Sequence, residues 1–265
     1  MQRNQLFWGV ALLLVGGLML ANEMGIKLPN GMSLTQLFWP LLLIFGGVWV
    51  LVGVFLRGNI ETEIASIDLQ GANSASIKIN HGAGDLKIHG GAGVVELARG
   101  SFAGGLDHKS TRNGDRLEVK MRPAKDVMEF PFFGPRTQLD WDLALNSEIP
   151  TALTLNLGAN KAMLDLRDMN LTDLKLETGA SETRITLPAR GRFHADFDLG
   201  AASLEVIVPV GLSARIQTSL GAVELKIDES RFPRNGSYYQ SLDFDAAANA
   251  VDMTIDAGAA SIKVL

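Results

Sequence analysis

The feature that most constrains the fold is a 21-residue repeat over residues 153–227. Its most visible members are Gly-Ala pairs: Gly158-Ala159, Gly179-Ala180, Gly200-Ala201 and Gly221-Ala222. Apolar residues keep the same phase, and one such column consists of Leu164, Ile185, Val206 and Ile227. A fixed period of this length is typical of a stacked architecture, in which each coil lies on the preceding one.

The residues on either side of each Gly-Ala pair alternate between apolar and polar, as in 195–199 and 203–208. Such alternation indicates half-buried strands, and glycine between strands indicates a tight bend. We therefore expect a unit of strand, Gly-Ala corner, strand and turn. Identical phases predict parallel stacking at about 4.8 Å per rung, which is a β-solenoid. The predicted structural turns are Gly158, Gly179, Gly200, Gly221 and Gly258.

The last of these turns belongs to a displaced rung. Gly258 lies 37 residues beyond Gly221, yet the apolar columns still match at that shift. The extra residues between 228 and 249 are expected to loop out. The sequence order then predicts that this rung is the final one, and that Val206 stacks between Ile185 and Ile227.

The N-terminal region has a different character, with apolar runs at residues 6–21 and 37–56. The second run is long enough to span a bilayer, and the first becomes so with flanking residues. A cleaved signal peptide is the alternative for the first run. We expect a two-pass hairpin in the cell membrane. Arg3 and Arg57 at the same side of the hairpin, against Lys27 in its loop, predict a cytoplasmic C-terminal domain.

Four segments follow from these patterns. Residues 1–57 form the membrane hairpin, 58–122 an N-terminal β region, 123–138 a loop and 139–265 the C-terminal β-solenoid. The β region is expected to begin with a polar linker over 58–66 and to be a less regular cap.

The loop is rich in proline and aromatic residues, including Phe130, Phe132 and Phe133. Proline rules out a central ladder strand there. The three rings either cap the end of the solenoid or contact a partner or the membrane.

The sequence offers little catalytic chemistry. Net charge is −5 with no basic stripe, which argues against nucleic-acid binding, and there is no cysteine. His81 and His89 are expected at surface corners, without the further ligands that a metal needs. One outward column contains Asn156, Glu177, Asp198, Ser219 and Asp256. A solvated face is favoured there over a Ca²⁺ site. We therefore expect no catalytic residues, no cofactor and no metal.

Several motifs together resemble the toastrack family of bacterial envelope proteins, including LiaF-like regulators of the cell-wall stress response. The resemblance rests on residues 80–88, 90–91 and 95–97, on Trp141 to Asn146 with Ile149-Pro150, and on the closing stretch 255–264. It implies a right-handed β-solenoid and a membrane-tethered role in envelope stress signalling, often beside a sensor kinase. It supplies no catalytic residues.

The expected function is a membrane-anchored, non-enzymatic interaction or regulatory module in the bacterial envelope stress response. Its expected partners are the lipid bilayer and a membrane sensor kinase or another envelope protein, and not nucleic acid. The alternative is a β-solenoid at the membrane that binds a carbohydrate or another ligand, or acts on a carbohydrate.

Overall fold

The computed structural model describes residues 16–17, 20, 44, 61–124 and 139–265. Residues 16, 17, 20 and 44 are helical. The rest of the expected membrane helices, 6–21 and 37–56, lies outside the described residues, and so does most of the aromatic loop. Within the described part, no helix has the length and apolar character needed to cross a membrane. The chain divides into two compact units, and the unit that comprises residues 59–129 and 136–265 is the β domain discussed below.

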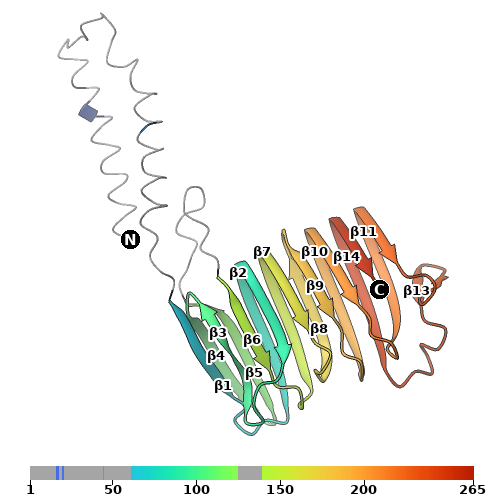
Figure 1. The fold of residues 1–265 in the computed structure, drawn as a ribbon, viewed down its shortest axis with the longest axis horizontal. Helices are drawn as coiled ribbons and strands as arrows, with labels where there is room; N and C mark the ends of the chain where they lie inside the picture. The colour runs from blue at the N-terminus through green and yellow to red at the C-terminus, as the bar shows by residue number, and fades with distance from the viewer. Residues whose placement is uncertain (1–15, 18–19, 21–43, 45–60, 125–138) are drawn as a thin grey trace, which may run out of the picture. The chain divides into compact units, whose positions relative to one another are not determined.

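The described β domain is built around six parallel rungs (Figure 1). In spatial order they are β2 (Ser74–Gly90), β7 (Thr151–Asp165), β8 (Leu171–Thr178) with β9 (Glu182–Thr186), β10 (Arg192–Ile207), β14 (Ala250–Val264) and β11 (Ser213–Ile227). Neighbouring rungs pair in register, for example Ala195 with Leu174 and Leu204 with Thr183. The described β domain is therefore all-β and fits a β-solenoid, while its hand stays a prediction.

Each rung turns a corner at its Gly-Ala pair, and most rungs do so within one continuous strand. In β7 the side chains alternate in and out as far as Leu157, which is buried. Gly158 and Ala159 then both face outward, and Asn160 is buried again. β10 and β14 show the same double outward step at Gly200 and Gly258. Because two consecutive residues face outward at the corner, the side chains on both halves of a rung can point into the same core.

The order of the last two rungs differs from the expectation. β14 does not follow β11 as the final rung but lies between β10 and β11, pairing in parallel with both. Val206 consequently stacks between Ile185 and Val264, and not beside Ile227. The columns of β11 and β14 have the same phase, so the repeat fits either order. The prediction was wrong because it equated sequence order with spatial order.

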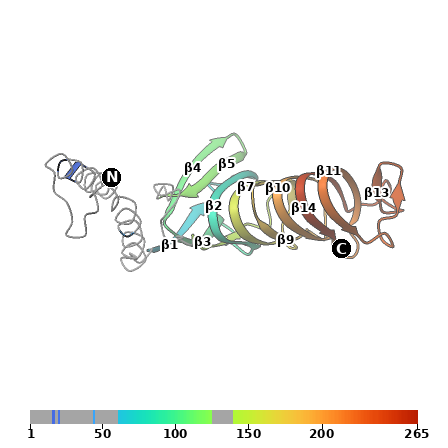
Figure 2. The same cartoon turned by 90° about the horizontal axis from the view of Figure 1, so that it is seen from above.

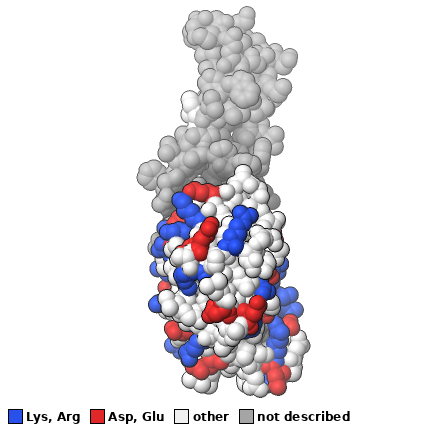
Figure 3. Space-filling view, turned by 90° about the vertical axis from the view of Figure 1, so that its right-hand side faces the viewer, with Lys and Arg blue, Asp and Glu red and all other residues white. Residues whose placement is uncertain are grey.

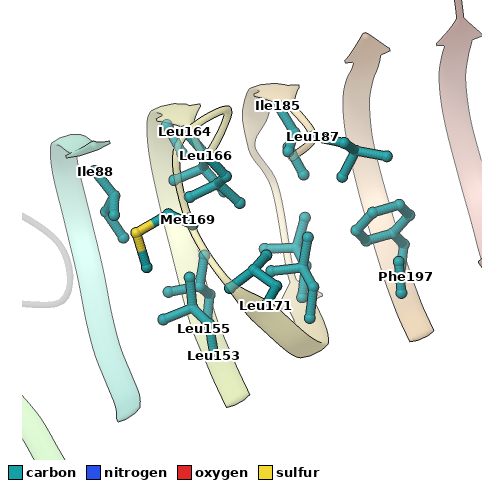
Figure 4. Packing of buried hydrophobic residues seen from close by; sticks show 14 of the residues in the cluster. Ile88, Leu153, Leu155, Leu164, Leu166, Met169, Leu171, Ile185, Leu187 and Phe197 are labelled. Carbon is teal, nitrogen blue, oxygen red and sulfur yellow. The ribbon is translucent and has the colours of Figure 1, made fainter. Parts of the chain in front are cut away.

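The core lies inside the rungs. Figure 4 shows Leu153, Leu155 and Leu164 of β7 packed with Ile185 of β9 and Phe197 of β10. The return loops also contribute, since Leu166, Leu187 and Val208 are each at most 1% exposed. Their backbones continue the stacking: the Leu187 N–H donates to the Ile207 carbonyl at 3.0 Å, and the Val208 N–H to that of Leu265 at 2.8 Å.

At the N-terminal end, β2 is itself a complete rung, paired with β7 from Ala75 to His89. Two further groups of strands extend it. β6 (Trp141–Leu145) pairs with the second half of β2 and continues to β3 (Glu96–Ala103) and β1 (Thr62–Asp68). β5 (Arg116–Pro123) pairs with the first half, and its hairpin partner is β4 (Leu106–Asn113) (Figure 2).

Two details of this end bear on the sequence analysis. The linker predicted over residues 58–66 is wrong, because β1 already begins at Thr62 and pairs with β3. The hairpin turn at Gly114 follows the Asn-Gly signal, with Asn113 paired to Arg116. Inside the end, Trp141 and Phe102 pack edge to face with ring centroids 4.9 Å apart.

At the C-terminal end, residues 228–249 leave the ladder and fold back over part of β11; we call them the C-terminal excursion. It contains the short hairpin β12 (Arg234–Asn235) and β13 (Tyr238–Gln240). β13 pairs antiparallel with Arg215 to Gln217 of β11. Phe232 and Phe244, 1% and 3% exposed, anchor the excursion. It therefore covers the first half of the end rung.

Candidate functional site

A polar surface feature runs along the outside of the corners. A shallow groove of about 520 Å³ crosses the first four rungs, and we call it the corner groove. Its polar wall consists of Asn80, Asn156, Glu177 and Asp198, and its floor includes Gly82, Gly158, Gly179 and Gly200. Each of these four rungs supplies one polar wall residue and one floor glycine, so the groove is a direct product of the repeat.

The floor of the groove depends on a column of glycines. A Cβ on Gly200 would lie 2.8 Å from the Gly179 carbonyl oxygen, and one on Gly221 would lie 2.5 Å from that of Gly258. A Cβ on Gly158 would collide with the Gly82 carbonyl oxygen. The backbone adopts no positive φ at these glycines. At Gly158, Gly200 and Gly221, glycine is needed because the adjacent corner approaches too closely for any side chain.

The five predicted turn residues all lie in this column. In spatial order it reads Gly82, Gly158, Gly179, Gly200, Gly258 and Gly221. Gly82 was expected at a corner, since His81 precedes it, but it was not placed in this column, because its neighbour in space, Gly158, is 76 residues away in sequence. Its identical place before an alanine was the signal that could have found it.

The polar wall continues beyond the corner groove, toward the C-terminal rungs, as an acidic column that ends in Asp256. Glu177, Asp198 and Asp256 are direct neighbours on β8, β10 and β14. The insertion of β14 creates this run of three carboxylates, since sequence order would have placed Ser219 beside Asp198. At the other end, the Asn156 side-chain amide donates to the Asn80 Oδ1 at 3.0 Å.

Lysines lie near these carboxylates, and both Lys175 and Lys78 act on Glu177. The Lys175 Nζ is 2.7 Å from Glu177 Oε1. That hydrogen bond lowers the pKa of Glu177 from its ordinary value. The same bond raises the pKa of Lys175, and the nearby carboxylates Asp196 and Asp198 raise it further. Lys175 offsets only part of the charge, so Asp196, Asp198 and Asp256 leave this face acidic.

A metal centre does not emerge from this arrangement. Among the described residues, no group of three or more histidine, aspartate or glutamate side chains is placed to hold a metal ion. Carboxylates on successive parallel rungs project side by side from a flat sheet, whereas Ca²⁺ requires six to eight oxygens around one point. The column is better suited to extended, multivalent contact with positively charged groups.

The two corner histidines differ from each other and do not meet. His81 was expected at the surface, but only 1% of it is exposed. It occupies the inward position before Gly82, hydrogen-bonds Asn160 and packs 5.1 Å from the Trp141 ring. His89 is exposed, with its Nε2 3.2 Å from Asp142 Oδ1. The surface prediction was wrong for His81, because the phase of the corner directs its side chain inward.

Burial affects the titration of His81. Desolvation lowers its pKa from 6.5 to about 4, and the Leu139 backbone and the Asp140 carboxylate offset this effect only in part. His81 is therefore neutral at physiological pH. Leu139 also packs close to Gly84, where a Cβ would lie 2.6 Å from its backbone. Leu139 is therefore close to both His81 and Gly84 in the packed N-terminal end of the β domain.

The outer face beyond the corners carries mixed charge. Arg184 pairs with Glu205 at 2.8 Å, and Lys263 follows Glu205 on the next rung. A depression of about 230 Å³ lies beside them. Positive and negative side chains alternate there and offset each other, so this face is less suited to binding a charged ligand than the corner groove. Phe130, Phe132 and Phe133, the predicted interaction residues, lie outside the described residues.

Comparisons with known proteins agree with this architecture. The family model described as the N-terminal domain of toast_rack matches residues 57–207, more than half of the chain. A second model, for the LiaI-LiaF-like transmembrane region, matches residues 6–51. The search of curated proteins found no match.

Two solved structures are similar to the chain. One is a candidate cell adhesion protein from Clostridium sporogenes, 20% identical with a TM-score of 0.68, covering 77% of this chain and 98% of its own. At that identity the likeness shows the fold alone. The other is a candidate adhesin from Bacteroides fragilis, 10% identical, covering 77% of this chain and 96% of its own. Its TM-score of 0.18 carries no argument.

Proposed function

The chain belongs to the toast_rack family, and on that premise we propose that it is a non-enzymatic interaction module of the bacterial envelope stress response that binds a cationic protein segment in its corner groove. The match of residues 6–51 to the LiaI-LiaF-like transmembrane region makes it a membrane protein. The number of spans and the side on which the solenoid lies stay predictions.

The observation that carries the proposal is the run of carboxylates at Glu177, Asp198 and Asp256. Parallel pairing holds them one rung apart, about 4.8 Å, on a rigid sheet. Folding gains nothing from three adjacent like charges, which repel one another. A basic segment lying across the rungs would neutralise them, and complementary charge of this kind speeds and selects encounters.

A membrane partner with a basic juxtamembrane segment fits this surface, and a sensor kinase is one such class. The test compares partner recovery from native membranes by the tagged full-length chain and by the variant Glu177→Gln, Asp198→Asn, Asp256→Asn. We expect the variant to lose a specific membrane partner, most markedly at low ionic strength where charge contacts are strongest.

A matched control removes the same number of carboxylates elsewhere. Asp68, Glu118 and Glu182 are exposed and lie outside the corner groove. The variant Asp68→Asn, Glu118→Gln, Glu182→Gln should keep the partner. Equal recovery by the two variants would contradict the groove as the binding surface.

The alternative function is binding of a carbohydrate or another ligand at the membrane, with an adhesive role as in the name of the Clostridium sporogenes relative. The mixed-charge depression beside Arg184 is its best location. Binding to a glycan panel that survives the groove variant and is lost with Arg184→Ala would favour this alternative over the protein partner.

A further inference from the structure

The end rung, β11, has an unpaired edge. One edge pairs with β14 from Ser213 to Ile227. The other edge pairs with β13 at Arg215 to Gln217 only. Beyond the corner, over residues 218–227, no described strand pairs with this edge. A row of free backbone N–H and C=O groups there is a template for another strand.

The same half-rung is also incompletely covered. Leu220, Val223, Leu225 and Ile227 pack against the core but are only partly buried. Two of their counterparts on β14, one rung inward, are closed off: Ile262, beside Leu225, is 1% exposed, and Val264, beside Ile227, is fully buried. The C-terminal excursion protects the first half of β11 and leaves this second half open. Solenoids normally need a polar cap at such an end.

The sequence of the open edge is complementary to itself. Residues 223–227 read Val-Glu-Leu-Lys-Ile. If two copies pair antiparallel about Leu225, Val223 lies opposite Ile227 and Glu224 lies opposite Lys226. Apolar residues then meet apolar residues on the inner face, and opposite charges meet on the outer face. Parallel pairing in register would instead place like charges together.

The neighbouring rung favours the same arrangement. Lys226 lies beside Lys263 of β14, so two ammonium groups are adjacent on the outer face. Within its own strand, Lys226 relies on an exposed contact with Glu224 at 2.8 Å. In the antiparallel pairing, Glu224 of the second copy would lie next to Lys226 of the first and supply a second carboxylate. Both signs of charge, around uncharged surface, are visible on this end of the molecule (Figure 3).

We propose that a second copy of this chain pairs with the open edge, joining the two solenoids end to end through antiparallel β11 strands centred on Leu225. The contact is isologous, as expected of a two-fold dimer, and it uses the same patch on both copies. It continues the ladder across the dimer and covers the partly exposed apolar residues. This dimer is independent of what the corner groove binds.

The absence of native cysteine allows a direct test in membranes. Opposed residues of antiparallel strands have Cα atoms about 4.5 to 5.5 Å apart, within the range that a disulfide bridges. Leu225→Cys in the full-length chain should therefore form a disulfide-linked dimer under mild oxidation. The control is Ser261→Cys, which is exposed but lies on β14, so its copies would be several strands apart.

A charge exchange tests the specificity of the pairing. Added to the Leu225→Cys chain, Glu224→Lys should reduce the dimer several-fold, because lysine would face lysine. Combining it with Lys226→Glu should restore the dimer. A second cross-linking design retains Leu225. One chain carries Glu224→Cys and a differently tagged chain carries Lys226→Cys, and the two are made in the same cells. The proposed pairing predicts more disulfide between the two different chains than between identical chains.

Three results would overturn the proposal. The first is equal cross-linking at residues 225 and 261, which would indicate random collision. The second is a Leu225→Cys cross-link to a different protein, which would show strand addition by another partner. The third is a monomeric mass for the full-length chain together with no cross-link from either cysteine design.

Discussion

The Gly200 backbone lies so close to Gly179 that a Cβ on Gly200 would be 2.8 Å from the Gly179 carbonyl oxygen. Gly200→Ala should therefore push adjacent corners apart and reduce the free energy of unfolding by about 1–3 kcal/mol. Gly82→Ala is the control in the same column, since a Cβ there has no atom within 4 Å. Denaturant unfolding of the detergent-solubilised chain measures both. Equal losses would mean that conformational freedom, and not close approach, selects these glycines.

The phase of β10 predicts opposite outcomes for two adjacent residues. Val206 is fully buried between Ile185 and Val264. Val206→Asp would bury an unpaired carboxylate at a cost of several kcal/mol, a large part of the ~5–15 kcal/mol that stabilise a domain. Glu205→Ala removes a largely screened ion pair with Arg184 and should cost under ~1 kcal/mol. Similar melting shifts for the two variants would contradict the strand phase.

Stability should depend on pH through His81. Its folded pKa of about 4 lies below the unfolded value of 6.5, so the unfolded chain binds more protons between these two pH values. The free energy of unfolding therefore falls as the pH is lowered through this window. His81 alone should account for about 2 kcal/mol between pH 7 and pH 5.

His81→Gln should flatten this pH dependence, whatever its effect at pH 7. His108→Gln is the control, because His108 is exposed on β4. Denaturant titrations at the two pH values give the difference directly. An unchanged slope in His81→Gln would show that other groups carry the acid sensitivity.

Topology can be measured with single cysteines in intact cells. Arg3 and Arg57 predict that both ends of the membrane hairpin are cytoplasmic. A cysteine at Ser33 should then react with a membrane-impermeant reagent, and one at Ser261, which is exposed on the solenoid, should not. The reverse pattern would place the solenoid outside the cell.

The aromatic loop permits a decision between two roles. Replacing Phe130, Phe132 and Phe133 with serine should lower the melting temperature sharply if the rings cap the core, since each buried ring contributes a few kcal/mol. If the rings face a partner or the bilayer, stability should persist and association should be lost. Melting and co-purification of the full-length variant separate the two. A variant that keeps both properties would exclude both roles.

The repeat predicted most of the solenoid because each rung has the same environment at the same phase. Gly158 occupies a corner that the neighbouring rung approaches closely, and Leu164 occupies an inward position of a half-rung. Spatial order is a different property. Val264 and Ile227 occupy the same column, and both are apolar residues at the same phase. The sequence pattern therefore does not distinguish which of them lies beside Val206. Pairing between β2 and β7 was missed for a related reason, because a long sequence separates them.

The candidate site was predictable to the same extent. The outward column of Glu177, Asp198 and Asp256 was read correctly as one phase, but the adjacency of Asp198 and Asp256 depends on the rung order. His81 was misplaced although its alignment with Leu157 indicated an inward side chain. A polar residue type was given more weight than its phase. The phase prevails because corner geometry fixes where a side chain points.

The position of β14 has a consequence for how the chain folds during synthesis. A solenoid whose rungs follow sequence order can grow one rung at a time as it leaves the ribosome. Here, β10 and β11 both emerge before the strand that joins them. Both lack their native neighbour until residues 250–264 have left the ribosome. The native order of the ladder thus depends on β14, and a ribosome that stalls just before residue 250 leaves a nascent chain without the strand that separates β10 from β11.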